Sequence, residues 1–245
     1  MFTRKWILAT LLVCLGAALC IRLGIWQLDR LSQRRVFNNQ VISMRALPPF
    51  DLNASTDAST LTSMEYRAVS VRGTYDFANQ VALLNQYHDS VLGYHLLTPL
   101  RLADGRAILV DRGWIPADGN KTPQGWSRYD AAAPAEVQGV MRLGVTKTPF
   151  GGRADPALAP GQSRLDFWNF VNLDRLAAQI PYPILPVYIQ PNPVANDATP
   201  PIPYQPEIDL SEGPHLGYAF QWFTFATILL IGYTIYLRKQ EATHS

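Results

Sequence analysis

The chain has 245 residues and a formal net charge of +2, with 48% of its residues hydrophobic and 16% charged. This charge content is low for a soluble protein, where about 25% is usual. The small net charge, without a basic stripe interleaved with aromatic residues, gives no sign of nucleic-acid binding. Both cysteines, Cys14 and Cys20, lie in the first apolar run, so the middle of the chain can form no disulfide, thiolate metal site or CxxC redox pair.

The first apolar run extends from Trp6 to Leu28 and is interrupted only by Arg22. As a helix it would be roughly 34 Å long, enough to cross the hydrocarbon core of a bilayer. Trp6 and Trp26 would lie at the two membrane interfaces. The alternative is a cleaved signal peptide, with a short basic start and small residues at 16–18. The apolar pattern continues past that site, which favours a membrane helix.

The second apolar run extends from Tyr218 to Leu237 and is followed at once by Arg238 and Lys239. Basic residues also precede the first run, so the positive-inside rule predicts that both tails are cytoplasmic. Three arginines after the first run argue the other way, but long translocated segments largely ignore the rule. The middle of the chain would then face the periplasm or the equivalent space of an organelle. No transit segment precedes Trp6, which favours a bacterial inner membrane.

Between the two runs, residues 29–45 carry polar residues at helical spacing, so the first helix should continue to about Arg45 and stop at Pro48. Residues 51–63 are rich in serine, threonine and alanine and indicate a mobile loop. Short alternating segments bounded by turn signals then predict an antiparallel sheet in the form of a partly closed barrel. These segments are Arg67–Tyr75, Gln80–Asn85, Tyr94–Arg101, Arg106–Arg112 and Glu136–Leu143, with a hairpin turn at 103–105.

The last part of the middle predicts a strand at Phe167–Val171, a short helix at 172–179 and a proline-rich extended tether at 183–206. The expected fold is an integral membrane protein in which two transmembrane helices flank an α+β, mainly antiparallel β domain. Its parts are a cytoplasmic tail at 1–5, a transmembrane helix at 6–28, a periplasmic domain with the tether at 29–214, a second transmembrane helix at 215–237 and a cytoplasmic tail at 238–245.

The sequence gives no support to an enzyme. It contains no GxSxG, HExxH, P-loop or helix-opening GxGxxG motif. His88, Asp89 and Ser90 have the letters of a catalytic triad, but adjacent residues cannot converge in space, so His88 is a polar loop residue. His95 falls in a predicted strand, exposed or satisfied there, and His244 falls in an inert tail.

Arg112-Gly113-Trp114 is predicted to end a strand in a tight turn. Arg112 could bind an anionic group there, and the alternative is a surface turn in which Trp114 packs inward.

His215 differs from the other histidines because it opens the second membrane helix. At helical spacing it lies over Tyr218, Trp222 and Phe225 on one face. A helix N-terminus disfavours the imidazolium, and neutral imidazole is the form that ligates iron. A haem held between two helices is one interpretation; an interfacial histidine that caps the helix is the other.

The first helix has a matching feature. Leu23, Gln27, Arg30 and Arg34 share a face, and Arg30 is expected at the level of His215 if the two helices pair. Guanidinium groups there could bind haem propionates by bidentate hydrogen bonds. The alternative is an anchor to lipid phosphates.

Four segments carry a resemblance to the Surfeit locus protein 1 family of cytochrome oxidase assembly factors. Gly24–Arg30 resembles the family's GxWQxxR, Gly93–Leu100 its GYxxxTPL strand, Leu109–Pro116 its VNRGWxP segment, and His215–Phe223 its HxxYAxQWF. Asp111 stands where the family commonly has Asn. The resemblance extends from about Gly24 to Leu237 in the same order.

The resemblance implies a non-enzymatic role: binding haem a and assisting its insertion into subunit I of cytochrome oxidase. Subunit I, haem A synthase and membrane lipid are the partners it implies, with no nucleic acid. The family's haem-associated histidine corresponds to His215, with Tyr218 and Trp222 packing the macrocycle, Trp26 nearby, and Arg30 or Arg112 at a propionate. The alternative is a scaffold that holds the oxidase subunit and binds no haem itself.

Overall fold

The computed structural model describes residues 4–54, 57–131, 134–148, 150–195 and 197–244. Residues 1–3 of the predicted N-terminal tail, residues 55–56 of the predicted loop and the last residue of the C-terminal tail lie outside that part. The chain divides into two compact units. One comprises the chain up to Gln40 together with the chain from Ile208 onward, and the other is Val41–Glu207.

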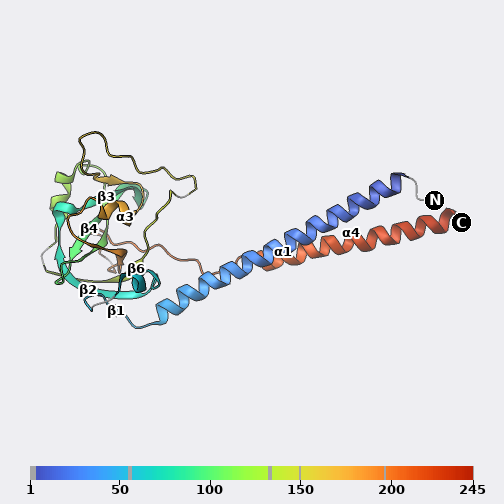
Figure 1. Cartoon of the computed structure of the whole chain (residues 1–245), viewed down its shortest axis with the longest axis horizontal. Helices are drawn as coiled ribbons and strands as arrows, with labels where there is room; N and C mark the ends of the chain where they lie inside the picture. The colour runs from blue at the N-terminus through green and yellow to red at the C-terminus, as the bar shows by residue number, and fades with distance from the viewer. Residues whose placement is uncertain (1–3, 55–56, 132–133, 149, 196, 245) are drawn as a thin grey trace. The chain divides into compact units, whose positions relative to one another are not determined.

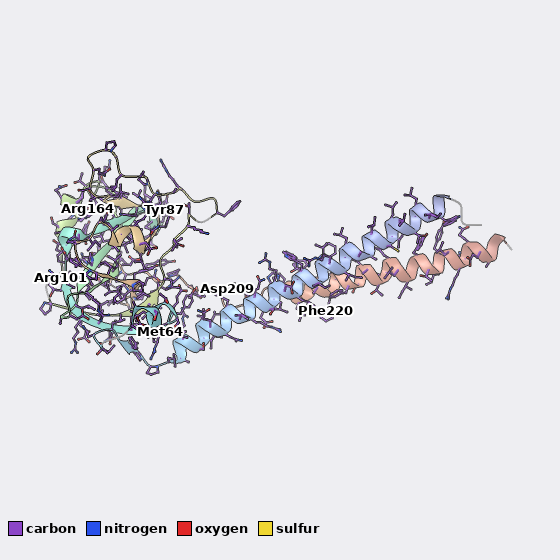
Figure 2. All side chains as sticks on the ribbon, in the orientation of Figure 1. Met64, Tyr87, Arg101, Arg164, Asp209 and Phe220 are labelled. Atoms are coloured by element: carbon purple, nitrogen blue, oxygen red, sulfur yellow. The ribbon has the colours of Figure 1, made fainter. Side chains whose placement is uncertain are left out.

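Two long apolar helices dominate the first unit: α1 (Arg4–Ala46), up to Gln40, and α4 (His215–His244). They lie side by side, with the two chain termini at the same end (Figure 1). Both are long and apolar enough to cross a membrane. In the most apolar stretch of each helix, only 11% of the residues of α1 and 6% of those of α4 are buried. A core helix of a soluble protein would be mostly buried, so this exposure fits helices that face lipid. Figure 2 shows such an exposed side chain at Phe220.

The second unit is a mixed, mainly antiparallel β domain, as the sequence predicts (Figure 1). In the described residues its strands are β1 (Phe50–Asp51), β2 (Ala68–Tyr75), β3 (Val81–His88), β4 (Val91–Arg101), β5 (Ala107–Pro116), β6 (Ala135–Arg142), β7 (Phe167–Trp168) and β8 (Ile184–Pro191). Its helices are α2 (Ala58–Thr62), α3 (Leu173–Ala177) and the 3-10 turns η1 (Phe77–Asn79) and η2 (Pro123–Tyr129).

The strand order is β1-β2-β6-β8-β5-β4-β3-β7, and a further pairing joins β2 to β4, with Thr74 opposite Arg101. This pairing closes β2, β6, β8, β5 and β4 into a barrel, which confirms the predicted closure. Ile108, Met141 and Ile189 are fully buried in the core that these strands form. A second core packs Leu176 of α3 against other strand residues. Since β5 is buried on both faces, it lacks the apolar–polar alternation of a half-exposed strand.

The predicted strands are confirmed within one residue at β2 and β6, whereas β3, β4 and β5 each extend three or four residues beyond the predicted bounds. The tight turn predicted at residues 112–114 is wrong, because this segment lies inside β5. Trp114 pairs with His95 across the β4–β5 ladder, and the register shift between His95 and Leu97 makes this part of β5 a bulge and not a strand end. The strand predicted at Phe167–Val171 is only two residues long, and the short helix that follows is confirmed as α3.

The predicted tether at 183–206 is also wrong over its first half. Ile184–Pro191 is β8, which lies between β5 and β6 in the middle of the sheet. Pro186 is tolerated because the β5–β8 register shifts between Ala107 and Leu109, and prolines within sheets are confined to edges and bulges. The following segment is also anchored, since Ile202 exchanges two backbone hydrogen bonds with Trp114.

The predicted mobile loop at 51–63 contains ordered structure in its described residues. Asp57 caps α2 by accepting a hydrogen bond from the backbone N–H of Ser59, and Leu61 is buried in the barrel core. One buried leucine among five residues gives too little periodicity for a helix to be predicted.

Candidate functional site

The helix pair is held together by a stripe of buried and half-buried residues, which recurs every three or four residues along α1 and is sparser on α4. On α1 this stripe includes small residues at Ala17 and Gly24, and on α4 at Ala219 and Ala226. Small residues let helix backbones approach closely within a membrane. Early in α1, the hydroxyl of Thr10 lies 2.7 Å from that of Tyr233, late in α4. Later in α1, Gln27 contacts His215, the first residue of α4. The two helices are therefore antiparallel neighbours.

Two of the sequence motifs meet in this interface. A Cβ at Gly24 would lie 2.6 Å from the ring of Phe223, so only glycine leaves room for that ring. One turn further along α1, Oε1 of Gln27 is 2.8 Å from Nδ1 of His215. Gln27 is 9% exposed and His215 is half-buried. The motif at the exit of the first helix and the motif that opens the second thus form a single contact surface.

The other ring nitrogen of His215 is open. Among the described residues, no hydrogen-bond partner is found for Nε2. Gly213, with a φ of +68°, precedes the helix, and a Cβ there would be 3.6 Å from Nε2. Glycine therefore supplies the left-handed backbone conformation and also leaves the space beside this nitrogen clear.

Side chains of α1 clamp the segment that leads into α4. Arg34 donates to the carbonyls of Asp209 and Ser211, the second at 2.9 Å. Asn38, which is buried, donates to the carbonyl of Leu210 at 2.6 Å. Arg35 forms a bidentate ion pair with Glu212 at 2.7 and 2.9 Å, and its hydrogen bond and charge lower the pKa of that carboxyl. These contacts fix the segment that precedes α4 against α1.

The other two predicted haem residues of α4, Tyr218 and Trp222, follow His215 by one and two helical turns. Tyr218 is exposed, while Trp222 is half-buried and packs edge-on against Phe225 with ring centroids 5.9 Å apart. At 3.6 residues per turn, Tyr218 and Phe225 lie on one flank of the buried stripe. Their rings are thus available to a flat ligand beside the helix pair.

On α1, the guanidinium of Arg30 lies 5.5 Å from the centroid of the Trp26 ring, and both side chains are exposed. In an antiparallel pair, positions with the spacing of Arg30 and Tyr218 lie on the same flank. The residue opposite His215 is Gln27, however, so Arg30 lies about one helical turn farther along α1 than expected. Sequence reasoning put Gln27 on the correct face but gave it no role, although a polar side chain at a membrane boundary is itself a functional signal.

Arg112 lies within the β domain, 7% exposed, with its guanidinium near the rings of Tyr75 and Phe77 at 5.3 and 5.0 Å. It donates to Oε1 of Gln80 at 3.0 Å and to the carbonyl of Tyr129. Burial lowers the pKa of this guanidinium, which arginine's high reference value still keeps charged. Its contacts are those of a buried structural cation.

The remaining histidines have local partners where their side chains are described. His95 is buried, and its Nδ1 is 3.1 Å from the carboxylate of Asp111. Of the two environments expected for His95, exposed or hydrogen-bonded within the domain, the second is the one observed. His88 ends β3 and stacks on Trp114 with ring centroids 5.3 Å apart. The side chain of His244 lies outside the described part of the chain.

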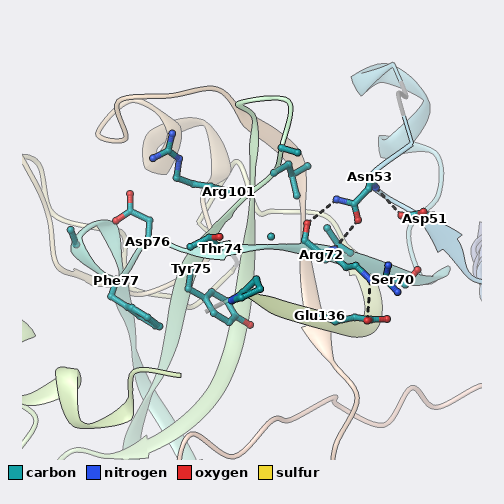
Figure 3. A pocket seen from close by; sticks show the side chains of 16 residues that line it. Asp51, Asn53, Ser70, Arg72, Thr74, Tyr75, Asp76, Phe77, Arg101 and Glu136 are labelled. Atoms are coloured by element: carbon teal, nitrogen blue, oxygen red, sulfur yellow. Dashed lines mark hydrogen bonds and ion pairs between the residues drawn. The ribbon is translucent and has the colours of Figure 1, made fainter. Parts of the chain in front are cut away.

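A cleft of about 1140 Å³ lies beside β2 in the β domain (Figure 3). Among its charged groups, Arg72 pairs with Glu136 at 3.0 Å, and Asp76 accepts a hydrogen bond from Tyr182 at 2.6 Å. The side chain of Asn53 bonds both the N–H and the carbonyl of Arg72, as a neighbouring strand would. Within the described residues, no group of three histidine, cysteine, aspartate or glutamate side chains could hold a metal ion.

Comparisons with known proteins single out one family. The SURF1 family model matches residues 14–227. Surfeit locus protein 1 of Xenopus tropicalis is 24% identical over 235 residues, which cover 89% of this chain and 71% of that protein. The SURF1-like protein of Monosiga brevicollis is 25% identical, covering 91% of this chain and 85% of its own length. The SURF1-like protein of Rickettsia bellii (strain RML369-C) is 24% identical, with 94% and 90% coverage.

Proposed function

This chain belongs to the SURF1 family of cytochrome oxidase assembly factors, and from that premise we propose that it binds haem a and assists its insertion into subunit I of the oxidase. The family is one of assembly factors and not of enzymes. Haem a is the cargo in this proposal, and haem A synthase, which makes haem a, is its expected donor.

The observation that carries the proposal is the environment of His215. One ring nitrogen is bonded to Gln27, and the other has an open approach beside Gly213. A neutral imidazole with a free nitrogen is a typical axial ligand of haem iron. The donor set therefore fits a haem held by a single protein histidine.

The residues around His215 fit the rest of the macrocycle. Tyr218 and Trp222 provide aromatic surface on α4, and Trp26 provides more on α1 near the same level. Among the described residues, the side chain of Arg30 contacts Gln33 and Trp26 at the surface, so its exposed guanidinium is the best candidate for a propionate. Arg112 is not part of the proposed site, because its donors already serve Gln80 and Tyr129 inside the β domain.

The test is the absorbance spectrum of the protein purified from cells that make haem a. We expect a haem a band in the wild-type protein, its loss in His215→Ala, and its retention in His88→Ala. His88 is the matched control because it is a half-exposed histidine in the β domain. An unchanged band in folded His215→Ala would remove His215 from the mechanism.

Purification without haem, but with the oxidase subunit still attached, would instead favour a scaffold that binds no cofactor. The helix clamp formed by Arg34, Arg35 and Asn38 would serve such a scaffold equally well. The haem spectrum separates these two functions directly.

The proposed site also requires a topology, with both tails in the cytoplasm and the β domain in the periplasm. A single cysteine at Ala103, in the exposed turn between β4 and β5, tests it in a variant that lacks Cys14 and Cys20. We expect a membrane-impermeant maleimide to label this cysteine in cells whose inner membrane is intact. Labelling only after lysis would contradict the topology.

A further inference from the structure

We infer that Gln27 is a positioning residue that fixes the ring of His215 with its proton on Nδ1 and the lone pair of Nε2 directed away from α1. This inference rests on the proposed function where it concerns haem. The proton position itself concerns the protein without any ligand.

The inference follows from the chemistry of the two groups. The Oε1 atom of Gln27 is an amide oxygen, which can accept a hydrogen bond but cannot donate one. With the amide in this orientation, Nδ1 of His215, 2.8 Å from the oxygen, carries the proton. A neutral imidazole has one proton, so Nε2 is left with a lone pair. This is the form that a metal ion can bind.

Burial makes the contact selective. Gln27 is 9% exposed and lies between two helices, where water competes poorly for the hydrogen bond. If the amide were reversed, its N–H₂ group would face Nδ1 and move the ring proton to Nε2, which would block a metal. The orientation of one amide thus decides whether His215 can act as a ligand.

The neighbouring contacts keep the two residues opposite each other. The ring of Phe223 occupies the space at Gly24, one turn from Gln27, and prevents the helices from sliding freely. On the other side, Arg34 and Asn38 hold the carbonyls of residues 209–211. Metal-bound histidines generally donate their second N–H to such a fixed acceptor, which orients the ring. The Oε1 atom of Gln27 is in the position of such an acceptor beside Nδ1 of His215.

The first experiment is NMR of ¹⁵N-histidine-labelled full-length protein in detergent without haem, with the His215 signals identified by their loss in His215→Ala. We expect Nδ1 to be protonated and Nε2 to have the shift of an unprotonated nitrogen. Gln27→Met, which keeps the length but has no acceptor oxygen, should release the ring into a mixture of tautomers. Gln27→Glu, which keeps an acceptor, should restore the Nδ1-protonated form.

The control is Gln33→Met. Gln33 lies on the exposed part of α1 and accepts a hydrogen bond only from Arg30. It should leave the His215 signals unchanged. A wild-type His215 protonated on Nε2, or a Gln27→Met protein with the wild-type tautomer, would overturn the inference.

The second experiment is haem a titration of the same proteins. Loss of such an acceptor typically weakens metal binding by about 10- to 100-fold, so we expect Gln27→Met to bind haem that much more weakly than Gln33→Met. If the wild type binds haem through His215 and Gln27→Met binds it equally well, the inference fails while the proposed function stands. If the wild type binds no haem, the proposed function fails, and the NMR result alone decides the tautomer.

Discussion

Gly24 of α1 and Phe223 of α4 fit together so closely that a methyl group on Gly24 would lie 2.6 Å from the Phe223 ring. These residues are far apart in the sequence, and each belongs to a motif that the family resemblance is built on. Their contact sets the register in which Gln27 meets His215. The register of the helix pair is therefore a property that mutation can test.

Gly24→Val should push the helices apart near Phe223, because inserting atoms into a packed interface costs about 1–3 kcal/mol. The measurement is cross-linking by a short bis-maleimide between Thr10→Cys and Tyr233→Cys, whose native hydroxyls are 2.7 Å apart, in a variant without Cys14 and Cys20. We expect slower cross-linking in Gly24→Val and recovery when Phe223→Ala is added. Equal rates in all three proteins would show that this contact does not set the register.

Ile189→Ala in β8 should lower the free energy of unfolding of the β domain by about 2–4 kcal/mol, because the side chain is fully buried in the barrel core. Val194→Ala, just after the strand and exposed, is the control and should change it by less than about 0.5 kcal/mol. Urea unfolding followed by tryptophan fluorescence of the full chain in detergent measures both. Similar effects of the two substitutions would mean that residues 184–191 are not an internal strand.

Arg112→Met should destabilise the β domain by about 2–4 kcal/mol, since it removes a buried cation together with its hydrogen bonds to Gln80 and Tyr129. The stability of Arg112→Lys should lie between that of the wild type and that of Arg112→Met, because an ammonium keeps the charge but lacks the planar guanidinium donors. Arg106→Met is the control at the surface, where Arg106 pairs with Asp104, and we expect about 0.5 kcal/mol or less. A stable Arg112→Met protein would contradict the structural role.

The pair formed by Asp76 and Tyr182 should make stability depend on pH at both extremes. Burial alone would raise the pKa of Asp76, but hydrogen bonds from Tyr182 and Asn79 outweigh it and lower that pKa. Its contribution is present above about pH 4, the unfolded value, and is lost as the pH falls through the folded pKa. Burial and Asp76 raise the pKa of Tyr182, so its contribution is present below about pH 10 and is lost as the pH rises further.

Tyr182→Phe is the corresponding variant. It should be less stable than the wild type by about 1–2 kcal/mol at pH 7, and the difference should shrink below pH 4 as Asp76 is protonated. Urea unfolding at pH 3 and pH 7 compares the two proteins. A difference that does not change with pH would show that the hydrogen bond is not to an ionised carboxylate.

The sequence predicted the parts of the fold that follow from local periodicity. The apolar runs gave both helices, and alternation with turn signals gave most of the antiparallel strands. β8 was missed because Pro183, Pro186 and Pro191 suggest an extended linker, whereas the structure accommodates Pro186 at an irregularity in the β5–β8 pairing. The extent of β5 was missed because burial on both faces removes the alternation that marks a strand end.

The sequence predicted only part of the candidate site. His215 was identified from its place at the head of α4, whereas Gln27 was placed on the same face as Arg30 but given no role. Whether Gln27 or Arg30 lies opposite His215 depends on the register of α1 against α4. The sequence of one helix holds no information about that register. It follows instead from the contact of Gly24 with Phe223, which only the folded pair reveals.

The position of β8 determines the order in which the molecule can assemble. β8 is the last strand to be synthesised, yet it hydrogen-bonds to both β5 and β6 in the middle of the sheet. The barrel cannot close until the ribosome has made almost the whole domain, and α4 follows within a few dozen residues. In the nascent chain, α1 is therefore complete long before α4, because 168 residues separate the end of α1 from the first residue of α4. During that interval Gln27 has no partner histidine, so its hydrogen bond can form only after His215 has been made.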